Sequence, residues 1–259
     1  MSSSSQPDYV ARNVEIWTKT NAEYTGPQAR KAWTEELHWS VFGIPEAELG
    51  VLGEVGGLDV VELGCGTAYV SAWLARRGAR PVGVDPTPAQ LATAREMQAE
   101  FGLEFPLVEA AAEDVPLADA SFDLAVSQYG ASIWADPYRW IPEAARLLRP
   151  GARLVFLRNS TIVTLCQSLE GATERLERPQ RGLGRIEWPD TGEVEFHLPT
   201  GELIDLLHGS GFQLQRLLEL YAPADAETHG YYDYVTADWA WKWPAEELWI
   251  ARRVVDVDA

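Results

Sequence analysis

The sequence predicts an α/β fold built around a doubly wound, largely parallel sheet, and three observations lead to this prediction. Short runs rich in β-forming residues alternate with segments of helical apolar spacing, which is the pattern of consecutive strand–helix–strand units. A turn containing Gly64 and Gly66 stands directly between such a strand and such a helix. The length of 259 residues and a hydrophobic fraction of 46% are sufficient for one domain with a sizeable core.

The expected elements follow one another in a regular order. Five strands are expected at residues 58–63, 81–85, 105–109, 122–127 and 153–158. Helices are expected between them at residues 69–77, 88–101 and 137–148, and Pro150-Gly151 closes the last of these. A helix at residues 200–208, opened by a Thr200 cap, and two strands at residues 212–220 and 247–254 complete a set of seven strands.

Three segments stand outside this alternation and carry most of the tryptophan: residues 1–50, 159–199 and 221–246. A single tryptophan in such a segment can simply pack within a helical cap. Taken together, the tryptophans indicate a cover over a site. We therefore expect residues 1–50 to form a helical N-terminal cap, followed by a domain over residues 51–259 in which the other two segments are lid insertions.

Composition excludes several classes of protein. The formal net charge of -18 disfavours nucleic acid as a partner, because binding to phosphate backbones needs clustered lysine and arginine. The N-terminal residues lack the pattern of a secretory signal, and no run approaches the roughly 18 apolar residues of a membrane span, so we expect a cytoplasmic protein. Cys65 and Cys166 form no paired spacing, and neither a metal site nor a disulfide is expected.

The glycine turn has the sequence context of a ligand-binding loop. Glycine at positions 64 and 66 lets the backbone approach a ligand, and the following helix N-terminus offers free N–H groups that suit a carboxylate. Asp85 ends the next strand, where an acidic side chain can accept hydrogen bonds from ribose hydroxyls. A glycine turn that only serves helix packing is the simpler alternative.

Two residues separate the possible cofactors. A dinucleotide-binding loop has a small residue at the position of Tyr69, because the helix must pack closely on the strand. Glu62 stands just before the loop, where a carboxylate is unfavourable beside a pyrophosphate but can bind an ammonium group or its water shell. Both residues favour S-adenosylmethionine over a nicotinamide or flavin dinucleotide.

Residues 58–158 resemble the class I S-adenosylmethionine-dependent methyltransferases of the type 11 group, which includes ubiquinone and menaquinone methyltransferases. Residues 60–68 resemble the first motif of the family, with Ala68 in place of the usual third glycine, and residues 82–85 resemble the second. Residues 112–117, followed by residues 121–123, resemble the stretch that holds the adenine. Residues 148–154 resemble the turn before the fifth strand, which is structural in the family.

The resemblance implies a Rossmann-like, seven-stranded mixed sheet whose last two strands form an antiparallel hairpin. It also implies S-adenosyl-L-methionine as cofactor and S-adenosyl-L-homocysteine as product. Ala111 stands where the family often has aspartate, so the adenine contact falls to either Glu113 or Asp114. The residues expected to hold the cofactor are Glu62, Gly64, Cys65, Gly66, Asp85, Pro86, Gln90, Ala112, Glu113, Asp114 and Gln128, with Tyr24, Trp17 and Trp33 closing over it.

Methyl transfer from a sulfonium is an in-line displacement, so positioning matters more than acid–base chemistry. Gln128 and Tyr129 follow the fourth strand and are expected near the methyl group, because ligands of open α/β sheets lie outside the carboxyl ends of the strands. A hydroxyl acceptor would also need a base. The candidates are His197, His38 and His229, one in each segment outside the sheet, whereas His208 is expected to end a helix.

The expected function is therefore S-adenosylmethionine-dependent methyl transfer to a small, apolar or aromatic molecule. The sequence leaves open whether oxygen, nitrogen or carbon is methylated. One alternative is a non-catalytic regulator that binds the cofactor through a methyltransferase fold. A second alternative is an NAD(P)-dependent oxidoreductase, which Tyr69 and Glu62 disfavour.

Overall fold

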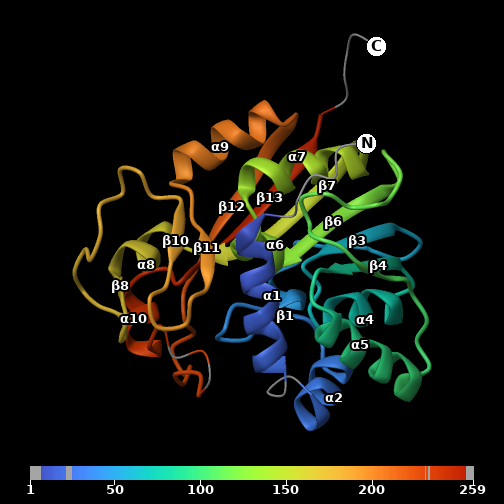
Figure 1. The fold of residues 1–259 in the computed structure, drawn as a ribbon, viewed down its shortest axis with the longest axis horizontal. Coiled ribbons are helices and arrows are strands. Elements are labelled where there is room, and N and C mark those ends of the chain that lie inside the picture. Colours follow the sequence, from blue (N-terminus) through green and yellow to red (C-terminus); the bar gives the residue numbers. More distant parts are fainter. Residues whose placement is uncertain (1–6, 22–24, 231, 233, 255–259) are drawn as a thin grey trace.

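The computed structural model describes residues 7–21, 25–230, 232 and 234–254. Its centre is one seven-stranded sheet in the order β12-β13-β7-β6-β3-β4-β5 (Figure 1). Neighbouring strands from β7 to β5 pair parallel, whereas β13 lies antiparallel to both β7 and β12. The mixed sheet and its antiparallel terminal hairpin are confirmed. The strands are β3 (Asp59–Leu63), β4 (Arg80–Asp85), β5 (Leu107–Glu109), β6 (Phe122–Gln128), β7 (Leu148–Asn159), β12 (Phe212–Leu220) and β13 (Glu246–Arg253).

Helices cover both faces of this sheet because successive strand residues alternate between two apolar clusters. Val61 packs with α7 and α9, whereas its neighbour Val60 packs with α4 and the segment before β3. A third cluster joins α2, α4 and α5 through Trp33 and Leu91. The helices around the sheet are α2 (Gly26–Thr34), α4 (Tyr69–Arg76), α5 (Pro88–Phe101), α6 (Gly130–Trp134), α7 (Pro137–Leu147) and α9 (Thr200–Gly209).

The three remaining segments are more varied than the predicted helical cap and lids. Figure 1 shows helix α1 and the hairpin β10–β11 at one end of the sheet, and the two elements contact each other. No helix among the described ranges combines the length and apolar character needed to cross a bilayer. The additional elements are α1 (Asp8–Thr20), β1 (His38–Trp39), β2 (Ile44–Pro45), α3 (Glu46–Leu49), α8 (Thr161–Cys166), β8 (Gln167–Ser168), β9 (Gly171–Ala172), β10 (Arg185–Glu187), β11 (Val194–Phe196) and α10 (Ala237–Lys242).

The predicted starts of two strands, β5 and β7, were wrong by more than one residue. Strand β5 begins two residues later than predicted, at Leu107, because Pro106 has no N–H with which to join the ladder. Strand β7 begins at Leu148, before the predicted turn at Pro150-Gly151. Leu148 pairs with Phe122 and Arg153 pairs with Leu124, so the residues between Leu148 and Arg153 form a bulge within the strand.

The turn after β3 and the start of α6 meet backbone to backbone. A Cβ on Gly130 would stand 2.7 Å from the Cα of Gly64, and a Cβ on Gly64 would stand 2.5 Å from the Ala131 nitrogen. Neither position has room for a side chain. The order of the strands in the sheet reverses between β3 and β6: β4 and β5 follow on one side of β3, whereas β6 and β7 lie on its other side. A ligand site is expected outside the carboxyl ends of the strands at such a point.

Replacing Gly130 tests this contact. We expect Gly130→Ala to lower the free energy of unfolding by about 2 kcal/mol or more, because the added methyl group meets backbone that cannot rotate away. Gly201, in the first turn of α9, has nothing within 4 Å of its ideal Cβ and is the matched control. Urea unfolding should show Gly201→Ala to be neutral or slightly stabilising, and equal effects of the two substitutions would contradict the proposed steric contact.

Candidate cofactor site

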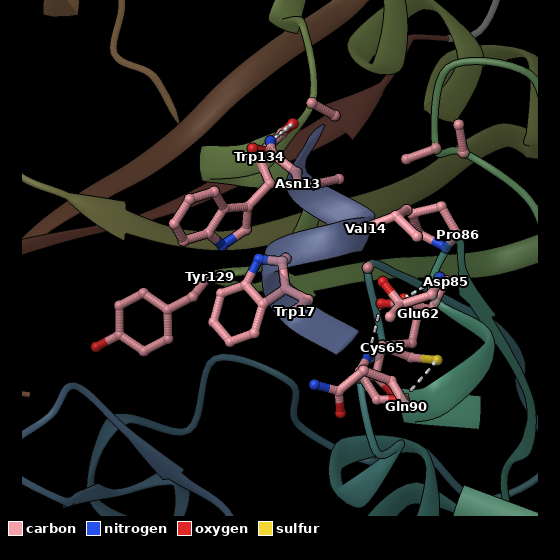
Figure 2. A pocket seen from close by; sticks show the side chains of 18 of the residues that line it. Asn13, Val14, Trp17, Glu62, Cys65, Asp85, Pro86, Gln90, Tyr129 and Trp134 are labelled. Carbon is pink, nitrogen blue, oxygen red and sulfur yellow. Dashed lines mark hydrogen bonds between the residues drawn. The ribbon is translucent and has the colours of Figure 1, made fainter. Parts of the chain in front are cut away.

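A cavity lies at the carboxyl ends of β3, β4 and β6, where it is covered by α1 (Figure 2). It encloses about 990 Å³ of empty space, which includes open solvent at its mouth. The residues predicted to hold a cofactor that line the cavity are Glu62, Gly64, Cys65, Gly66, Asp85, Pro86, Gln90, Ala112, Glu113, Gln128 and Trp17.

The glycine turn is held in shape by hydrogen bonds to the neighbouring strand. The backbone N–H groups of Gly64 and Cys65 both donate to the carbonyl of Val84, at 2.8 and 2.9 Å. Gly66 has a φ of +53°, and a Cβ there would find only the Gln90 Oε1 atom, 3.9 Å away. The backbone at Gly66 is therefore open to a ligand. Ala68, which replaces the usual glycine, also adopts a left-handed φ of 60°.

Asp85 connects the turn with the end of β4. Its Oδ2 atom accepts a hydrogen bond from the Gly66 N–H, and its Oδ1 atom accepts one from the Thr87 N–H, both at 2.8 Å. The Thr87 hydroxyl also bonds to this carboxylate, which has about four acceptor positions when ionised, so a position remains for a ligand hydroxyl. Burial raises the pKa of Asp85. The fixed carboxylate is thus suited to a ribose hydroxyl.

Glu62 is an almost fully buried acid at the end of β3. Its Oε2 atom accepts hydrogen bonds from both the backbone N–H and the hydroxyl of Ser71. Burial raises the pKa of Glu62 to about 8. No lysine or arginine in the described part of the chain lines the cavity, although Glu62, Asp85 and Glu113 all do. Such an acidic lining favours a cationic ligand and disfavours a pyrophosphate.

The two candidates for the adenine contact differ in their position relative to the cavity. Glu113 lines the cavity and Asp114 does not. The Oε1 atom of Glu113 accepts hydrogen bonds from the Tyr9 hydroxyl at 2.7 Å and from the Asp136 N–H at 3.1 Å. Helix α1 is thereby attached to the loop after β5.

Helix α1 contributes one face to the cavity wall. Val10, Asn13, Val14 and Trp17 line the cavity, at the three- and four-residue spacing of one helix face. Figure 2 shows Trp17 beside Trp134, and their rings meet edge to face at a centroid distance of 5.2 Å. The prediction named Trp17 but missed Val10, Asn13 and Val14. Their helical spacing relative to Trp17 is the feature of the sequence that could have identified them.

The insertion holds α1 in place. Asn13 Nδ2 donates to the Val194 carbonyl at 2.9 Å, and the Val194 N–H donates to Asn13 Oδ1 at 3.0 Å. Arg12 donates to the Gly192 carbonyl in the same hairpin. Residues that lie far apart in the sequence therefore form one cover over the cavity.

Two of the predicted cofactor residues, Trp33 and Asp114, do not line the cavity. Trp33 lies behind the glycine turn, where its Nε1 atom donates to the Thr67 carbonyl at 2.8 Å and its ring stacks near Phe101 and Phe105. It supports the loop from the protein interior, because its large apolar ring is buried in the cluster between α2 and α5. Tyr24 lies outside the described residues.

The three histidines proposed as bases also lie outside the cavity lining. His197 is fully buried, and its Nε2 atom is 2.7 Å from Glu195 Oε2. His38 contributes its backbone carbonyl, which accepts a hydrogen bond from Gln128 Nε2 at 2.8 Å. His229 accepts a hydrogen bond from the Tyr232 N–H. Tyr129 is the candidate from the predicted catalytic set that does line the cavity.

Known methyltransferases resemble this chain in the sequence around the glycine turn and in fold. Residues 61–156 match the sequence profile of the family described as "Methyltransferase domain". An uncharacterized methyltransferase of Mycobacterium tuberculosis is 43% identical over 101 residues, which is 39% of this chain and 40% of that protein. A demethylmenaquinone methyltransferase of Thermus thermophilus is 37% identical over 100 residues, covering 38% of this chain and 46% of that protein. These curated relatives are therefore matched over less than half of their own length.

The likeness in fold extends further along the chain. The crystal structure of an S-adenosylmethionine-dependent methyltransferase from Mesorhizobium loti is 28% identical, with a TM-score of 0.64, over 80% of this chain and 96% of that chain. A second solved structure, from Listeria monocytogenes, has the same TM-score at 16% identity. The predicted resemblance and cofactor class are confirmed: the chain contains a methyltransferase domain with the fold of the S-adenosylmethionine-dependent methyltransferases.

Proposed function

We propose that this protein transfers the methyl group of S-adenosylmethionine to a small, apolar or aromatic acceptor in the cavity under α1. The observation that carries the proposal is the lining of this cavity. It combines an open glycine turn and buried acids with an aromatic wall, and no lysine or arginine of the described residues lines it. These features suit a cationic nucleoside and disfavour a dinucleotide.

The residues present fit the cofactor at three places. Asp85 offers an anchored carboxylate for a ribose hydroxyl, and the open backbone at Gly66 allows a close approach. Glu62 offers a buried carboxylate for the amino-acid tail. Glu113 lines the cavity and is the residue that we propose contacts the adenine. When bound, the cofactor supplies an electrophilic methyl group on a positively charged sulfur.

The acceptor would lie against the aromatic wall. Trp17, Trp134, Tyr69, Tyr129 and Tyr232 all line the cavity, and they come from four separate parts of the chain. Aromatic rings can hold a flat apolar molecule while excluding water. The net charge of -18 supports a small molecule rather than a nucleic acid as the acceptor.

The first test separates the proposed enzyme from its alternatives. We expect calorimetry to show binding of S-adenosylmethionine and no comparable binding of NADH, and mass spectrometry to show S-adenosylhomocysteine formed with members of a phenol panel. Binding of NADH alone would contradict the assignment of the cofactor. Cofactor binding without turnover of any panel member would instead favour the non-catalytic regulator.

Asp85 provides a direct test of the ribose assignment. We expect Asp85→Asn to weaken the binding of S-adenosylhomocysteine about tenfold or more, because hydrogen bonds to a charged acceptor are replaced by weaker or mismatched ones. Asp123 is the matched control, since its carboxylate also accepts a backbone N–H, from Asp59, but does not line the cavity. Calorimetry should show Asp123→Asn binding normally, and an unchanged affinity of Asp85→Asn would show that the ribose lies elsewhere.

Glu62 predicts a pH dependence of cofactor binding. The ammonium group of the ligand favours ionised Glu62, and in the free protein burial raises the pKa of this acid to about 8. Below that pH, binding must remove the proton, so the affinity for S-adenosylhomocysteine should increase as the pH rises towards 8. Calorimetry between pH 6 and about 8 should show a flatter profile for Glu62→Gln. Parallel profiles of the two proteins would contradict this role.

A further inference from the structure

Tyr129 occupies a fixed position at the edge of the cavity. It directly follows β6 and caps α6, with a φ of 56°, a left-handed conformation that is unusual for a residue other than glycine. Its neighbour Gly130 is in close backbone contact with Gly64. The position of the tyrosine is therefore tied to the position of the cofactor turn. Backbone strain of this kind is often retained at functional sites.

Behind Tyr129 lies a buried carboxylate, that of Glu246. Strand β13 begins at Glu246 and runs antiparallel to β7, which places Glu246 opposite Asn159 at the carboxyl end of β7. The Tyr129 hydroxyl donates a hydrogen bond to Glu246 Oε1. The same oxygen accepts the Val41 N–H at 2.9 Å, and the Tyr234 hydroxyl lies 3.5 Å from it.

Glu246 has unusual surroundings for an acid. Its relative exposure is 0%, and the hydrogen bonds that lower its pKa come from uncharged donors: the hydroxyls of Ser40, Tyr129 and Tyr234 and the Val41 N–H. No described lysine, arginine or histidine forms an ion pair with it. Burying a carboxylate without a cation is costly, and hydrogen bonds from uncharged donors offset only part of that cost. A proton delivered through one of these donors would remove the buried charge, and the Tyr129 hydroxyl is the donor whose residue lines the cavity.

We propose that Tyr129 and Glu246 form a proton relay that serves a hydroxyl-bearing methyl acceptor. The inference rests on the proposed function and extends it to the chemistry of the acceptor. The acceptor oxygen forms its bond to the methyl carbon while the bond from that carbon to sulfur breaks, and the bonding electron pair stays on sulfur. The hydroxyl proton passes to the Tyr129 oxygen, and the tyrosine's own proton passes to Glu246.

The relay selects a hydroxyl over an amine on chemical grounds. A neutral amine attacks with its free electron pair and loses its proton afterwards, whereas a neutral hydroxyl is a weak nucleophile until its proton is removed. The cavity offers no histidine for this task among the described residues. Burial also raises the pKa of Glu246, which suits a group that must hold a proton after transfer. Tyr129 is then a catalytic residue, and Glu246 is a positioning and proton-storing residue behind it.

The test compares two phenols that differ in ionisation. The probes are 2-naphthol, which keeps its proton near neutral pH, and para-nitrophenol, which is largely ionised in a mildly alkaline assay. We expect Glu246→Gln and Tyr129→Phe each to lower kcat for 2-naphthol about 100-fold, while kcat for para-nitrophenol changes by less than about threefold. The affinity for S-adenosylhomocysteine should remain that of the unmodified protein.

A second tyrosine–glutamate pair provides the matched control. The Tyr138 hydroxyl donates to Glu202 in the same way, but Tyr138 is 51% exposed and does not line the cavity. Tyr138→Phe and Glu202→Gln should leave both rates unchanged. If Glu246→Gln does not fold, Tyr129→Phe carries the same comparison, because it removes the relay hydroxyl and leaves the carboxylate in place.

The possible outcomes distinguish a failure of the proton relay from a failure of the proposed methyltransferase function. If the two variants lose equal kcat with both phenols, or lose none with 2-naphthol, the relay is wrong and Glu246 has only a structural role. An unmodified protein that binds S-adenosylhomocysteine but methylates neither phenol would also overturn it, because the relay would have no hydroxyl to serve. An unmodified protein that binds no S-adenosylhomocysteine would contradict the proposed function itself.

Discussion

The close backbone contact between Gly64 and Gly130 determines how the site is assembled. Gly64 begins the turn that follows β3, and Gly130 begins the helix that follows β6. Neither position has room for a Cβ, so the two loops can pack this closely only with glycine at both positions. The contact lies where the strand order reverses, and it joins the turn that we propose binds the cofactor to the segment of Tyr129, which we propose contacts the acceptor. Alignment of this kind can supply much of the acceleration of an in-line displacement.

Electrostatics complement this geometry. Three buried acids around the site, Glu62, Asp85 and Glu246, and the half-buried Glu113 all have raised pKa values because burial removes water from their carboxylates. A cationic ligand would offset part of that cost, and an anionic one would increase it. The cover is built differently, from hydrogen bonds between segments. Asn13 of α1 bonds to Val194 of the insertion, and Tyr9 bonds to Glu113.

The sheet could be predicted from the sequence because its strands and helices follow local rules. Short runs of β-forming residues identified all seven strands of the central sheet, and the helix over Pro88–Phe101 has the predicted bounds. The glycine turn could be placed because a strand precedes it and a helix follows it. The histidines could not be assigned, since the same residue type serves as a buried partner of Glu195 at position 197 and as a backbone acceptor at position 38. The sequence did not identify Glu246, because its hydrogen bond with the Tyr129 hydroxyl joins residues that are 117 positions apart.

The central claim is that S-adenosylmethionine binds between the glycine turn and α1. Amide hydrogen exchange with and without S-adenosylhomocysteine tests this claim most directly, because it reports where the chain is protected. The structure predicts slower exchange in three places: the turn after β3, the loop that begins α5 near Thr87, and helix α1 together with the hairpin β10–β11 that holds it. Protection confined to other regions, or no change in the turn after β3, would contradict the account.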